Sequence, residues 1–105
     1  MTIRNTQIES ANITEIFSAT GQQAITTMIF CNTDPSTDAT VDVFVVPSLS
    51  NPGQATQTMK SLSLPATETF VLDTERLILE DGDTIHAQAS VDAIVTVTVS
   101  SLTTA

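Results

Sequence analysis

The sequence predicts a single all-β domain: a two-sheet antiparallel β-sandwich, jelly-roll or Ig-like, with seven or eight short strands. Three observations support this. Apolar residues recur at every second position, whereas the helical period is almost absent. Turn-forming residues interrupt the alternation roughly every 8 to 12 residues. The chain is rich in Thr and Val, whose branched side chains suit a pleated strand, and it has no Trp or Tyr.

The strongest alternation runs through residues 93–100, and it predicts a strand with one buried face. Ala93, Val95, Val97 and Val99 fall on that face, opposite Thr96, Thr98 and Ser100. Ala39–Val46 also alternates, but both of its faces carry apolar residues. We therefore expect it to be a central or doubly covered strand, which Pro47 ends because proline cannot donate to a ladder.

Six further segments complete the predicted strands. Ala24–Cys31 is apolar on both faces, and Thr84–Ala89 alternates between apolar and polar residues. Weaker strands are predicted at Ile13–Ala19, Thr56–Leu62, Glu68–Leu72 and Arg76–Leu79.

The chain is short enough for one domain, which we expect to span residues 13–102. Residues 1–12 are predicted to form a flexible N-terminal arm, and we expect its polar part, Thr2–Ser10, to become ordered only on assembly. This polar start lacks the apolar segment of a signal peptide, and no apolar run reaches the length of a membrane-spanning helix. We therefore expect synthesis in the cytoplasm.

Twelve acidic residues oppose three basic ones, which gives a formal net charge of −9. The basic residues Arg4, Lys60 and Arg76 are scattered, whereas phosphate-binding surfaces need clustered Lys and Arg. The charge therefore predicts no direct contact with nucleic acid or with an anionic membrane. It also predicts repulsion between copies, which an assembly must overcome by burying apolar surface or by binding cations.

No set of residues predicts a catalytic site. His86 falls on the polar face of a predicted strand, where we expect it to meet solvent, and no motif places a nucleophile beside it. Cys31 ends an apolar strand, where a thiol is usually a small core residue. One cysteine and one histidine cannot supply the four ligands of structural zinc. We expect neither enzymatic activity nor a cofactor.

Acidic residues gather in two predicted turns. Asp34 and Asp38 share one loop, and Glu80, Asp81 and Asp83 surround Gly82 in another. Carboxylates bind hard cations, so a calcium site at Glu80, Asp81 and Asp83 is one interpretation. The simpler interpretation is that Asp81-Gly82 supplies the positive φ angles of a two-residue hairpin.

Several segments occur in an order found in one group of viral proteins. Phe30–Thr33 ends a Thr- and Ile-rich strand, and Ala39–Val45 follows a small polar loop. Further on come Ser63–Ala66, Leu77–Ser90 and a closing Val/Thr strand. Over residues 13–100 this order resembles the small β-sandwich virion proteins of tailed bacteriophages, particularly those of aquatic bacteria and cyanobacteria. At Ile16–Gly21 the chain departs from the Tyr-x-Val-Pro-Ala that usually begins their first hairpin.

This resemblance implies a structural component of the virion, made in the host cytoplasm, and it transfers no catalytic residue. The first expectation is a capsid decoration (cement) protein on the particle exterior, because packaged DNA would repel an acidic protein inside. A neck or tail accessory protein is the alternative within the same particle. Other virion proteins and further copies of the chain are the expected partners. From a different class, a small adhesin or carbohydrate-binding module remains open, although sugar-stacking aromatic residues are scarce.

Overall fold

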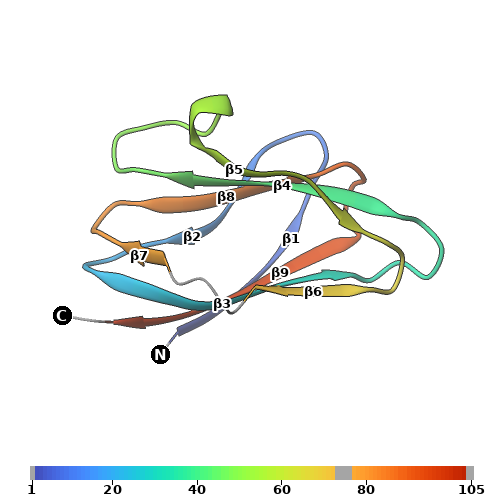
Figure 1. Cartoon of the computed structure of the whole chain (residues 1–105), viewed down its shortest axis with the longest axis horizontal. Coiled ribbons are helices and arrows are strands. Elements are labelled where there is room, and N and C mark those ends of the chain that lie inside the picture. Colours follow the sequence, from blue (N-terminus) through green and yellow to red (C-terminus); the bar gives the residue numbers. More distant parts are fainter. Residues whose placement is uncertain (1, 73–76, 104–105) are drawn as a thin grey trace.

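The computed structural model describes residues 2–72 and 77–103, which form nine strands and one short 3-10 turn and contain no α-helix (Figure 1). The elements are β1 (Thr2–Ile8), β2 (Thr14–Ser18), β3 (Gln23–Asn32), β4 (Ala39–Val46), η1 (Gln54–Thr56), β5 (Gln57–Leu64), β6 (Thr69–Leu72), β7 (Leu77–Leu79), β8 (Thr84–Ala89) and β9 (Val95–Thr103). The predicted all-β class is confirmed. Arg76, with which the predicted strand Arg76–Leu79 begins, lies outside the described residues.

The strands form two antiparallel sheets that pack face to face. Sheet A has the order β1-β9-β3-β6, and β7 pairs with the other end of β3. Sheet B has the order β2-β8-β4-β5. Figure 1 shows sheet B as the upper layer and sheet A as the lower layer, with β7 at their left-hand side. The predicted β-sandwich is therefore confirmed.

The strand pairings identify the sandwich as a jelly roll. β4 pairs with β5, β3 with β6, β2 with β8 and β1 with β9, so the pairs nest inside one another along the chain like one long hairpin. Rolling up this hairpin adds the pairings of β3 with β9 and of β4 with β8. This double-sheet topology is the jelly roll rather than the Ig-like alternative.

The core lies between the sheets and follows the predicted alternation. Val95, Val97 and Val99 of β9 are fully buried, and their neighbours along the strand face outward. Ala93, which the sequence places on the same face, was predicted wrongly. It precedes β9 at a φ of 60° and is exposed, and its amide donates to the carbonyl of Ile8 at 3.3 Å. The chain turns here because it crosses from β8 in sheet B to β9 in sheet A.

The prediction that Ala39–Val46 is a central or doubly covered strand is confirmed. β4 lies between β8 and β5, with Val41 and Val43 buried in the core. Phe44 and Val46 point to the other side of the sheet and are also buried. η1, in the segment between β4 and β5, contacts β4.

The predicted flexible arm at residues 1–12 needs correction. Thr2–Ile8 is strand β1, which pairs with β9 from the Thr2–Ser101 pair to the Ile8–Val95 pair. The sequence hides this strand because β1 is an edge strand, and of its described side chains only Ile8 is buried. Arg4 reaches across to sheet B, where Nη1 lies 3.5 Å from Glu15 Oε2. We now expect the amides that pair with β9 to be protected from exchange before any assembly.

Ser101 places a hydroxyl group in the core. It is fully buried on the inner side of β9, and its hydroxyl finds no hydrogen-bond partner among the described residues. An unpaired buried hydroxyl costs free energy. Ser101→Ala is therefore expected to raise the free energy of unfolding by about 1 kcal/mol, measured by urea denaturation.

Ser100→Ala is the matched control, because Ser100 faces outward on the same strand and its hydroxyl interacts with that of Thr26. That substitution should leave stability unchanged or lower it. A destabilised Ser101→Ala variant would mean that the hydroxyl does have a partner.

Candidate functional site

The two reactive side chains lie on opposite outer faces of the sandwich. Cys31 lies opposite Thr69 and Thr96 in sheet A, and His86 lies opposite Glu15 and Phe44 in sheet B. Cys31 is half-buried and points away from the core, so its prediction as a core residue was wrong. The core separates it from His86, and the two cannot act together.

His86 keeps the predicted position on the outward side of its strand, but it is half-buried rather than fully exposed. Partial burial lowers the pKa of His86, and the neighbouring carboxylate of Glu15 opposes this shift. Its Nδ1 lies 3.4 Å from the hydroxyl of Thr84. Because Cys31, the one cysteine of the chain, lies in the other sheet, no thiol lies beside His86, and the hydroxyl of Thr84 is its neighbour instead.

The acidic turn joins two elements of different sheets, so the hairpin interpretation of Asp81-Gly82 was wrong. β7 before the turn pairs with β3 in sheet A, whereas β8 after it belongs to sheet B. Only Gly82 has the expected positive φ, at 88°, and a Cβ there would come within 2.6 Å of the Ser48 hydroxyl. The turn therefore needs glycine both for its backbone angle and for the close approach of Ser48.

The carboxylates of this turn accept hydrogen bonds that hold neighbouring segments together. Asp83 accepts from the amide of Ser48 at 2.8 Å and from that of Glu80 at 2.9 Å. Asp81 accepts from the amide of Gly21 at 2.9 Å, and Glu80 from the side chain of Gln22 at 2.9 Å. Among residues 2–72 and 77–103, no group of three or more His, Cys, Asp or Glu side chains is arranged to hold a metal ion. The calcium interpretation gains no geometric support.

We expect Asp83→Ala to lower the free energy of unfolding by about 1–2 kcal/mol, because two backbone amides lose a charged acceptor. The loss should be equal in calcium and in EDTA, which thermal unfolding of both variants will measure. Asp92→Ala is the control, because its carboxylate is exposed and accepts a single longer bond, from Ser10 at 3.3 Å. A calcium-dependent difference for Asp83→Ala would instead support the metal site.

The loop after β3 also uses its carboxylates structurally. Asp34 accepts hydrogen bonds from the amides of Ser36 at 3.1 Å and Thr37 at 2.7 Å, and these bonds, led by that from Ser36, lower the pKa of Asp34. Asp38 accepts from the amide of Ala66 at 3.0 Å. Asp34 and Asp38 thus fix the loop that joins sheet A to sheet B.

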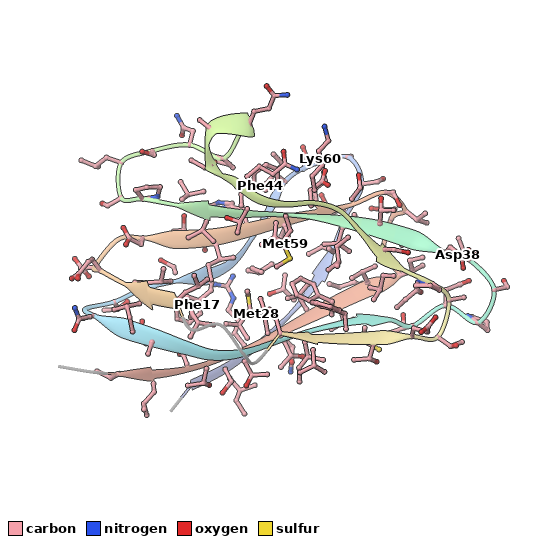
Figure 2. The ribbon with its side chains drawn as sticks, viewed as in Figure 1. Phe17, Met28, Asp38, Phe44, Met59 and Lys60 are labelled. Carbon is pink, nitrogen blue, oxygen red and sulfur yellow. The ribbon has the colours of Figure 1, made fainter. Side chains whose placement is uncertain are left out.

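An apolar cavity of about 220 Å³ lies between the two sheets at the side where β5 faces β6 and β7. Met28, Val43, Val45, Thr58, Met59, Leu72 and Leu77 line it. Figure 2 shows Met28 and Met59 lying between the two layers, on strands of opposite sheets. None of the described side chains that line it is charged, so these side chains include no group suited to acid–base catalysis or cation binding.

The outer face of sheet A is the most unusual surface of the described structure, because no strand residue on it is charged. Its members alternate with the buried residues and lie opposite one another in the strand register. They are Ile3, Asn5, Gln7, Ala24, Thr27, Ile29, Cys31, Thr69, Val71, Ile78, Thr96, Thr98, Ser100 and Leu102. We call these residues the uncharged face.

The uncharged face also holds most of the exposed large apolar residues. Of the five such residues in the described structure, four lie on it: Ile3 is 64% exposed, Ile78 56%, Val71 48% and Leu102 46%. Ala24 lies directly between Leu102 and Ile78 in the register, which makes a continuous apolar row across three strands. A sheet face that has no charged strand residue and carries several exposed apolar side chains is typical of a surface that another protein covers.

The outer face of sheet B is different. Glu15 and Asp42 lie on it, with His86 between their strands. Asp42 accepts a hydrogen bond from the amide of Ser61 at 2.8 Å, and Figure 2 shows Lys60 of β5 pointing away from the sandwich. The two outer faces of the sandwich therefore have different electrostatic character.

Sequence reasoning missed the uncharged face, although a signal was present. In residues 24–31 and 93–100 the positions opposite the buried residues carry no charge, despite the twelve acidic residues of the chain. No described helix is long and apolar enough to cross a membrane. Comparison of the chain with protein-family models, curated proteins and solved structures finds no match.

Proposed function

We propose that this chain is a non-enzymatic structural protein of a bacteriophage virion, and specifically a capsid decoration protein on the particle exterior. The observation that carries the proposal is the uncharged face: a sheet surface whose described strand residues include no charge and no reactive cluster, on a chain with a net charge of −9. Such a surface suits protein–protein packing better than catalysis or small-molecule binding.

The topology supports this proposal by analogy. Jelly rolls serve as building blocks of viral capsids and also as lectin domains. A fold alone does not assign a function, but the order of segments from Phe30–Thr33 to the last strand resembles tailed-phage virion proteins. Both lines favour an architectural role.

Charge favours the exterior of the particle. Acidic side chains on the outer face of sheet B and in the turns at Asp34–Asp38 and Glu80–Asp83 would be repelled by packaged DNA. On the outside, the same acids would face solvent and limit the aggregation of particles.

The proposal is tested on particles purified from the host that expresses this chain. Mass spectrometry should detect the chain at a fixed ratio to the major capsid protein, and protease added to intact particles should digest it. Its absence from purified particles, or full protection from protease, would overturn the proposal.

Cryo-electron microscopy of these particles separates a decoration protein from a neck or tail accessory protein. Density for the jelly roll repeated over the head surface supports the decoration role. A single ring at the portal or along the tail supports the accessory role. Deleting the gene should lower the thermal stability of heads in the first case and block tail joining in the second.

The adhesin or lectin alternative shares the jelly roll but is less well supported. Sugar platforms need exposed aromatic rings; here Phe17, Phe30 and Phe44 are buried, and Phe70 packs against the core. Glycan-array binding by the purified chain, abolished by a surface substitution, would favour this alternative.

A further inference from the structure

We propose that the uncharged face is the contact between two copies of this chain, which pack their sheets A together around a twofold axis. The inference rests on the proposed function, because it assumes that this face serves assembly. It adds that the partner at this face is a second copy of the chain. Two sheets packed at about 10 Å with their strands roughly aligned are a common arrangement in β proteins.

The choice of a second copy follows from charge. Each copy carries a formal charge of −9, so most contacts between copies bring acids together. On the outer face of sheet B such a contact would oppose Glu15 and Asp42 with their counterparts. The uncharged face is a broad described surface on which two copies can meet without facing carboxylates of their strands, whereas a basic partner would be drawn to the acidic surfaces instead.

The residues of the face suit a self-complementary contact. Ile78 and Leu102 flank Ala24 in one row, and Ile29 pairs with Val71 and Thr98 in another. These are mostly branched side chains of medium size, which interdigitate between stacked sheets. Around a twofold axis, each apolar row needs only the same surface on the other copy.

The area of the uncharged face determines how tightly the two copies are expected to bind. Four strands about 4.8 Å apart and about seven residues long give roughly 20 by 24 Å. The area of this rectangle is smaller than the roughly 800 Å² that each partner buries in a standard stable interface. The dimer should therefore be weak in dilute solution and be reinforced where copies are concentrated on a particle.

Sedimentation velocity of the purified full chain at increasing concentration tests the proposal. A monomer–dimer equilibrium should appear, and added NaCl should tighten it, because salt screens the repulsion between the acidic copies while the contact itself contains no ion pair. Ile78→Asp and Val71→Asp should each weaken dimerisation at least tenfold. Leu49→Asp, which changes a fully exposed apolar residue off the face, should leave it unchanged.

Cys31 provides a second readout without any substitution, because it lies on the uncharged face. Its rate of reaction with a thiol reagent such as DTNB should fall as the chain concentration rises into the dimer range. The Ile78→Asp variant should show no such fall. Both acidic substitutions replace half-exposed side chains, and unchanged circular dichroism will show that the variants are folded.

Three results would overturn the inference: a chain that stays monomeric at all concentrations, a dimer that salt weakens, or a dimer that Ile78→Asp and Val71→Asp leave intact. These outcomes are distinct from those of the particle experiment. A monomeric chain found on virions removes the dimer and leaves the virion role standing. A chain that dimerises but is absent from virions would remove the virion role and leave the dimer standing.

Discussion

Replacing Asn32 by aspartate is expected to lower the free energy of unfolding by roughly 3 kcal/mol or more. Asn32 ends β3 with its side chain 1% exposed. Its amide nitrogen donates to the carbonyls of Thr37 at 2.9 Å and Leu64 at 3.0 Å, and its side-chain oxygen accepts from the amide of Asp34 at 3.0 Å. The Asn32→Asp variant loses both donated bonds and places a buried carboxylate against two carbonyl oxygens.

Urea denaturation at several pH values will measure this effect. Burial and the facing carbonyls favour the protonated form of the introduced carboxyl. The destabilisation should therefore be largest at neutral pH and should shrink as the pH falls and the folded protein takes up the proton.

Asn51→Asp is the matched control, because Asn51 is an exposed loop residue. It should change stability by less than about 0.5 kcal/mol. Equal effects for Asn32→Asp and Asn51→Asp would mean that Asn32 does not join the loop to the end of β5.

The sequence predicted the strands that have a buried face, because burial on one side of a strand imposes alternation. Ala39–Val46 and Thr84–Ala89 match β4 and β8 residue for residue. β1 was missed because an edge strand needs few apolar residues. Ile3 and Ile8 are its only apolar residues, and the polar residues around them are typical of a flexible arm. Strand pairing was beyond prediction, since alternation fixes which face is buried but not which strand lies next to it.

The local chemistry of the candidate sites was only partly predictable. The positive φ of Gly82 followed from the Asp-Gly pair, but Gly21 and Ser48, which donate to Asp81 and Asp83, lie in loops more than thirty residues away in the chain. Cys31 was assigned to the core because its strand looked apolar on both faces. Ile29 is an apolar residue on the outward side of that strand, so this side resembled a second buried face in the sequence.

Phe30→Ala is expected to lower the free energy of unfolding by about 3–5 kcal/mol, a large part of the roughly 5–15 kcal/mol available to a domain. Phe30 is fully buried on β3, the strand that pairs with β6, β7 and β9, and its ring lies 6.2 Å from that of Phe70. Its removal leaves a cavity that strands fixed on both sides cannot close. Phe30→Leu should cost roughly 1–2 kcal/mol, since most of the buried volume is retained.

This pair of variants also separates stability from assembly, because Phe30 points into the core while its neighbour Ile29 points to the uncharged face. Phe30→Leu should lower the urea midpoint and, well below that midpoint, keep the dimerisation constant of the unmodified chain. Ile78→Asp should do the opposite and weaken dimerisation at a nearly unchanged midpoint. If Phe30→Leu weakened dimerisation as strongly as Ile78→Asp does, association would depend on the core rather than on the uncharged face.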